Sequence, residues 1–251
     1  MTVLMVLLGK ELKGQLKTYR ALVVAAAFFF FGLGTPLMLK FLPQILDLSG
    51  DDLGIIQLPQ FTSADVMKSY VGSFGQIGLL TAVLITMGAV AGEMGGTAAM
   101  VLSKPVGRGR FIVAKLLALA AVIAFSLAIG AGGAYLYTSI LFGGLGASGF
   151  LFGNVLLALY LLVATALTLM FSCFFRSGLA AGACGLAGAI ALSATSGLPW
   201  VGQHVPGMLL AWAESAATGV EFSAWSALAV SAGIVVLATI AGWAVFKRKE
   251  L

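Results

Sequence analysis

The sequence predicts an all-α membrane protein with six transmembrane helices, and three observations lead to that fold class. The 251 residues are 61% hydrophobic and only 9% charged, whereas about a quarter of the residues in a soluble domain are charged. The charged residues occur in clusters, and the uncharged segments between them are long enough for a bilayer crossing, which takes about 20 apolar residues. The sign of the charge also alternates from one cluster to the next along the chain.

The uncharged segments define the spans. The longest of them, from Leu116 to Phe175, is too long for one crossing, and the glycine-rich stretch Phe142–Gly149 divides it in two. We treat residues 1–251 as a single transmembrane permease domain. Its predicted spans are about 21–39, 70–91, 112–141, 151–175, 178–196 and 223–246.

The basic residues predict the orientation, because cytoplasmic connections carry an excess of lysine and arginine. Basic clusters lie before span one, between spans two and three, between four and five, and after six: Lys10, Lys13, Lys17, Arg20, Lys104, Arg108, Arg110, Lys115, Arg176, Lys247, Arg248 and Lys249. The opposite side has two lysines, Lys40 and Lys68, against six acids: Asp47, Asp51, Asp52, Asp65, Glu214 and Glu221. We therefore expect a multi-pass protein of the cell membrane with both termini cytoplasmic. The net charge of +5 then reflects topology, and no nucleic-acid partner is expected.

Residues 1–20 predict an amphipathic helix ahead of span one. Apolar residues recur at helical spacing from Leu4 to Tyr19, while Lys10, Lys13 and Lys17 share another face. Such a helix lies in the cytoplasmic interface with its lysines toward lipid headgroups. The alternative is a plain helical extension of span one.

The chain between spans five and six predicts short outer helices. The stretch from Gly197 to Ala217 is too short to cross the bilayer and return, yet too apolar for a free loop. Trp200 and Trp212 are expected at headgroup depth, where tryptophan is enriched. A re-entrant or interfacial helix pair fits these features.

The sequence lacks the motifs and residues that several kinds of chemistry require. It contains no G-x-x-x-x-G-K-[ST] phosphate loop, and no ionisable residue lies deep in a predicted span, where a proton-coupled carrier usually keeps one. Cys173 and Cys184 have no His or acidic neighbours that would complete a metal site. We therefore expect no enzyme activity, metal or cofactor in this chain, and any uphill transport must draw its energy from outside the chain.

The most informative segment, residues 92–110, joins spans two and three. It predicts a short helix along the cytoplasmic face that ends at Pro105. Arg108, Arg110 and Lys115 are expected to anchor the next span at the headgroups. Glu93 is the only acid there, and it could contact a basic partner residue or cap the helix start. The alternative for the whole segment is an amphipathic loop with no partner.

This segment resembles the coupling helix of ABC-2-type permeases, the membrane subunits of bacterial ATP-binding-cassette exporters. The family pattern is an acidic residue, Gly-Thr, an apolar run, Leu-Ser-x-Pro, an Arg and a later Lys. The matching positions are Glu93, Gly96, Thr97, Leu102, Ser103, Pro105, Arg108 and Lys115. The overall plan is also similar, although many relatives carry several acids where this chain has only Glu93.

The resemblance implies a transmembrane subunit that moves a hydrophobic or amphiphilic substrate out of the cytoplasm or inner leaflet. A separate ABC ATPase would hold ATP and Mg and contact the coupling segment, and a second permease copy, identical or related, would complete the pathway. Spans one, two and five would face that pathway. Ser193, Thr195 and Ser196 could then be polar contacts near its outer end, or simply a span end that meets water.

An alternative function is a rhomboid-like intramembrane serine protease. Ser148 lies in a Gly-x-Ser-Gly sequence, and His204 begins a His-x-x-Gly sequence. A Ser–His pair within hydrogen-bond distance can act in nucleophilic catalysis. However, both residues are predicted in exposed connections, where a Gly–Ser turn and a solvated histidine explain them without catalysis.

Overall fold

A computed structural model describes residues 3–48, 61–93 and 107–249, and the described residues form helices and turns with no strand. Six helical segments are long and apolar enough to cross a membrane, so the predicted fold class is confirmed. These segments are α2 (Arg20–Leu48), the succession α3 (Ser63–Ser73), η1 (Phe74–Gly78) and α4 (Leu79–Thr86), then α6 (Arg108–Phe142), α7 (Ala147–Phe174), α8 (Gly178–Ala194) and α10 (Trp225–Arg248). The shorter elements are α1 (Val3–Lys17), η2 (Thr195–Gly197), η3 (Gly202–His204) and α9 (Met208–Thr218).

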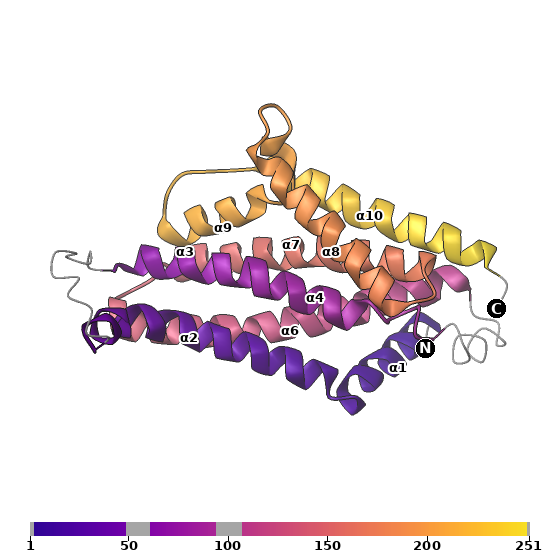
Figure 1. The fold of residues 1–251 in the computed structure, drawn as a ribbon, viewed down its shortest axis with the longest axis horizontal. Coiled ribbons are helices and arrows are strands. Elements are labelled where there is room, and N and C mark those ends of the chain that lie inside the picture. Colours follow the sequence, from indigo (N-terminus) through magenta and orange to yellow (C-terminus); the bar gives the residue numbers. More distant parts are fainter. Residues whose placement is uncertain (1–2, 49–60, 94–106, 250–251) are drawn as a thin grey trace.

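The long helices run side by side, and both ends of the chain lie at one end of the bundle (Figure 1). The turn between α7 and α8 lies at that same end, whereas the turn between α6 and α7 lies at the other. Helix α7 is at the centre and packs against α4, α6, α8, α9 and α10. We call the end that holds both termini the shared end.

Helices α2 and α6 approach each other through glycines. A Cβ atom on Gly32 would lie 2.2 Å from the carbonyl oxygen of Gly130, and one on Gly130 would lie 2.6 Å from the carbonyl oxygen of Phe28. Phe28 is buried, and its ring meets that of Phe74 edge-on at 5.1 Å. Small residues of this kind let helix backbones come close in a membrane, where burial of apolar surface supplies little driving force.

Helices α8 and α9 flank α7 in different ways. Helix α8 uses Gly185 against Thr168 of α7 but leaves most of its surface uncovered. Helix α9 packs on the first turns of α7, where Gly149 and Gly153 face its backbone carbonyls. Of the two tryptophans expected at headgroup depth, Trp212 is buried between Phe152 and Trp225. Trp200, in contrast, is 88% exposed.

Helix α1 is separate from α2, because the chain turns at Thr18 and Tyr19, and Tyr19 has a left-handed φ of 56°. It packs along α6 with Leu7 buried. Leu4, Leu8 and Leu12 are half-buried, whereas Val3, Met5, Val6 and Leu16 are exposed. The helix predicted for residues 1–20 therefore exists as an element that ends before α2 begins.

Replacing Gly32 by alanine tests the close contact between α2 and α6. Backbone atoms surround this position, so the helices must move apart, and we expect Gly32→Ala to lower stability by about 1–3 kcal/mol. Gly34, on the same helix, has nothing within 4 Å of its missing Cβ, so Gly34→Ala should be neutral or stabilising by up to about 1 kcal/mol. Thermal unfolding of the purified variants in detergent would measure both. Equal melting temperatures would contradict the proposed contact.

Candidate functional site

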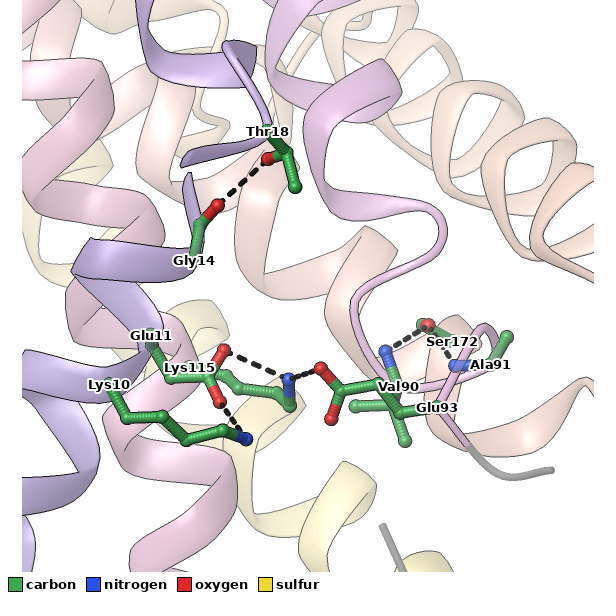
Figure 2. A network of polar contacts seen from close by, with 9 residues as sticks. All are labelled: Lys10, Glu11, Gly14, Thr18, Val90, Ala91, Glu93, Lys115 and Ser172. Atoms are coloured by element: carbon green, nitrogen blue, oxygen red, sulfur yellow. Dashed lines mark hydrogen bonds and ion pairs between the residues drawn. The ribbon is translucent and has the colours of Figure 1, made fainter. Parts of the chain in front are cut away.

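The site lies at the shared end, where α1, α6 and the chain that follows α4 meet around Lys115 (Figure 2). The Nζ atom of Lys115 donates to Glu11 Oε2 at 3.0 Å and lies 2.9 Å from Glu93 Oε1. Its side chain is 2% exposed, against 11% for Glu11 and 26% for Glu93. One buried cation thus joins two carboxylates from two different segments.

The two carboxylates offset the cost of burying the lysine. An ammonium group taken out of water loses several kcal/mol of hydration, which only close and well-oriented partners restore. The ring of Phe111 adds a cation–π contact at 4.9 Å. The Nζ atom of the exposed Lys10 lies 3.3 Å from Glu11 Oε1, so both oxygens of this carboxylate have a cationic partner. Removing Lys115 would leave two partly buried carboxylates close together without the cation that joins them.

Ser172 of α7 holds the chain that leaves α4. After α4, residues 87–93 form turns, and the hydroxyl of Ser172 accepts hydrogen bonds from the backbone N–H groups of Val90 and Ala91 at 3.1 and 3.0 Å. The same hydroxyl donates to the carbonyl oxygen of Met87 at 3.0 Å. These bonds satisfy backbone groups that the end of a helix leaves without partners. Glu93 is thereby held beside α6 (Figure 2).

Arg108 begins α6 and binds the end of α10. Its guanidinium group donates to three carbonyl oxygens at the end of α10, those of Phe246, Lys247 and Lys249. A cation here also opposes the negative end of the helix dipole. Lys249 in turn donates to the carbonyl oxygen of Phe174 at 2.9 Å, at the end of α7. Partial burial lowers the pKa of the Lys249 amine from its ordinary value.

The predicted coupling residues divide into two groups. Glu93 and Arg108 are described, and both make contacts inside the chain. Gly96, Thr97, Leu102, Ser103 and Pro105 lie outside the described residues, as does the predicted coupling helix. The expectation that Lys115 reaches the headgroups is wrong, because its side chain is buried between two acids. The two roles considered for Glu93 were contact with a basic residue of a partner protein and capping of a helix. Neither included an ion pair with Lys115 of the same chain.

The predicted pathway residues bond to their own helix. Ser193, Thr195 and Ser196 donate to the carbonyl oxygens of Ala189, Leu192 and Ser193, respectively. Ser193 also meets Tyr160 of α7, with 3.1 Å between the two oxygens. Because the Ser193 hydroxyl donates to Ala189, the Tyr160 hydroxyl is the donor of this second bond. The end of α8 is thus tied to α7 at one point.

Ser148 and His204 are both exposed, Ser148 in the first turn of α7 and His204 in η3. No hydrogen bond joins the two in the part of the chain that the structure describes. No observation in the structure supports the protease.

Sequence reasoning missed Glu11 and Ser172. Glu11 had a detectable signal, because it is the only acid before Asp47 and stands among lysines on an amphipathic helix. A lone acid in a basic segment that can reach a buried lysine is a reasonable candidate partner. Ser172 had no such signal, since serine is common in transmembrane helices, where it bonds to its own backbone.

A lysine replacement tests whether the ion network holds the site together. We expect Lys115→Met to lower stability by about 3 kcal/mol, at the low end for breaking a buried ion pair. It leaves the partly buried Glu93 carboxylate without a cation, whereas Glu11 keeps Lys10. The triple variant with Glu11→Gln, Glu93→Gln and Lys115→Met should recover most of that loss, since no charge is then buried. Lys13→Met, at an exposed position on α1, should stay within about 0.5 kcal/mol of the parent. The measurement is thermal unfolding in detergent, and a triple variant no more stable than Lys115→Met would refute this account.

Comparison with known proteins identifies the family. A model of the ABC-2 family transporter proteins matches residues 5–251. The chain is also 31% identical over 257 residues to the uncharacterized transmembrane protein YxlG of Bacillus subtilis (strain 168), covering 100% of this chain and 99% of that protein. The family match spans the six helices and the site around Lys115. The chain therefore belongs to the ABC-2 family of transporter proteins, the membrane subunits of ABC transporters.

Proposed function

We propose that this chain exports a hydrophobic or amphiphilic substrate from the cytoplasm or inner leaflet, driven by a separate ABC ATPase. The observation that carries the proposal is the family match over residues 5–251, because proteins of this family normally work with such an ATPase. ATP and Mg would be bound by that partner, in keeping with a sequence that has no phosphate loop of its own.

The contacts around Lys115 suggest how force could enter the bundle. The predicted coupling segment leaves the described chain at Glu93, which is held to α6 by Lys115, and returns near Arg108, which is bonded to the end of α10. Ser172 ties the same region to α7. A push on the segment by an ATPase would therefore reach α1, α6, α7 and α10 together. In this proposal Glu93 and Arg108 are positioning residues.

The pathway is proposed to form against a second copy of the permease, identical or related. Helices α2 and α8 support this role because both leave much of their apolar surface uncovered, including Phe30 and Met38 on α2 and Leu179 and Ile190 on α8. Helix α8 also carries no charged residue. An uncharged surface of this kind suits an amphiphile better than a strongly ionic substrate, because a buried ion needs a partner.

The orientation proposed is a cytoplasmic shared end in the cell membrane. Its support is the charge pattern, since the basic clusters fall at the end that holds both termini (Figure 1). Lysine and arginine are retained on the cytoplasmic side during insertion.

Purification with the ABC ATPase encoded nearest to this chain tests the function. We expect the two proteins to co-purify, and ATP hydrolysis to depend on the permease in proteoliposomes. Glu93→Gln and Ser172→Ala should lower that hydrolysis several-fold without loss of membrane insertion, because each loosens the start of the coupling segment.

Ser231→Ala is the matched control. Its hydroxyl is buried on α10 and has no hydrogen-bond partner among the described residues, so its removal should leave hydrolysis unchanged. Failure to co-purify would refute the proposed partner. Full hydrolysis in both site variants would refute the proposed coupling role of these contacts.

Cysteine labelling tests the orientation. In a version lacking Cys173 and Cys184, we introduce Arg176→Cys at the shared end and Glu221→Cys between α9 and α10, two exposed positions. An impermeant maleimide should label intact cells at position 221 and label position 176 only after lysis. The reverse pattern would invert the proposed topology, and external labelling of both would refute the six-span arrangement.

A further inference from the structure

A polar cavity of about 250 Å³ opens beside the Lys115 network and has no assigned role. It lies between α1, the start of α2, the turns after α4, and α6. Its polar lining includes Glu11, Gln15, Thr18, Arg20, Glu93 and Lys115. A water molecule occupies roughly 30 Å³ in the liquid, so the cavity has room for a group of several heavy atoms.

The cavity contains acceptors without donors and a cation without an anion. Glu93 Oε2 and Gln15 Oε1 are buried, and no described residue donates a hydrogen bond to either. Arg20 lines the same cavity, and none of the ion pairs among the described residues includes it. Buried polar atoms are normally bonded, so Glu93 Oε2 and Gln15 Oε1 indicate a missing hydrogen-bond donor. Arg20 is exposed at the same cavity and offers its positive charge to an anionic part of that partner.

The charge of the lining narrows the class of that partner. Glu11 and Glu93 are balanced by Lys115 and Arg20, so the cavity as a whole is close to neutral. A simple anion or cation would upset this balance, whereas a zwitterion would keep it. The unpaired carboxylate oxygen suits a primary ammonium group, and the unpaired guanidinium suits a phosphate, to which arginine can bond through two N–H groups.

The position of the cavity indicates where this missing partner would come from. Arg20 is the first residue of α2, Glu93 follows the second span, and Lys115 lies near the start of α6, so the cavity is at the level where spans end. Exposed apolar side chains, including Leu16, Tyr19, Leu22 and Val23, surround the junction of α1 and α2. A phospholipid could place its headgroup in the cavity and its acyl chains along this apolar surface.

We propose that this cavity binds the ethanolamine-phosphate headgroup of a membrane phospholipid. The ammonium group donates to Glu93 Oε2 and Gln15 Oε1, and the phosphate accepts from Arg20. A choline headgroup has the same net charge but no N–H donor, so it cannot satisfy the two acceptors. The proposal does not depend on the transport function, because it concerns the isolated chain.

Native mass spectrometry of the purified full chain, without nucleotide or ATPase, tests this directly. The protein is offered equal amounts of dioleoyl phosphatidylethanolamine and dioleoyl phosphatidylcholine. Hydrogen bonds to a charged group contribute enough for roughly a tenfold preference, so we expect about that ratio in favour of phosphatidylethanolamine. Equal retention of the two lipids would overturn the proposal and leave water as the occupant.

Variants separate the cavity from general lipid binding. Gln15→Leu and Arg20→Gln should each remove most of the preference, and neither touches the Lys115 ion network. Glu93→Gln should do the same. Lys13→Gln, on an exposed part of α1, and Glu214→Gln, on α9, are the controls and should keep the parent ratio. A parent-like ratio in both Gln15→Leu and Arg20→Gln would overturn the assignment.

A soluble competitor distinguishes a lipid from a free metabolite. O-phosphoethanolamine carries the same two charged groups without acyl chains. We expect it to displace the lipid only at large excess, because it lacks contact with the apolar surface. Displacement at equimolar concentration would show that the cavity takes a soluble ligand and would refute the lipid assignment.

Discussion

Burial of Lys115 is the constraint around which the shared end of this permease is arranged. A lysine that is 2% exposed needs anionic partners, and the chain supplies them from α1 and from the turns after α4. That requirement fixes where α1 lies along α6 and where the predicted coupling segment leaves the bundle. Glu93 turns one of its oxygens toward Lys115, and its other oxygen is buried without a described partner beside the cavity.

The transmembrane plan could be predicted from the sequence because the bilayer acts on each segment separately. A run of apolar residues such as 223–246 must cross or be buried, whatever its neighbours do. The partnership of Lys115 could not be predicted in this way. In the sequence, Lys115 is a charged residue near the start of a span, and a lysine there usually extends to the headgroups. Only the packing of α1 against α6 shows that Glu11 blocks that route.

Sequence reasoning found only part of the site, and the reason is similar. Glu93 and Arg108 were found because a motif includes them, but the motif says nothing about what they touch. Ser172 acts through three backbone groups on another helix, and a serine of that kind looks the same in sequence as Ser231, which bonds to nothing described. The spacing of glycines in the sequence likewise does not show which of them contact another helix. Gly32 and Gly34 are equally small, yet only Gly32 meets another backbone.

The separation between Glu11 and Lys115 has a consequence for synthesis. These partners lie 104 residues apart, whereas Glu93 and Lys115 flank a single connection between consecutive spans. Glu11 emerges from the ribosome long before Lys115 is made. Until then α1 can be held at the membrane only by its apolar face and its own lysines. Glu93 can engage Lys115 as soon as α6 inserts. The first helix made can therefore dock at the shared end only after the third span has been synthesised.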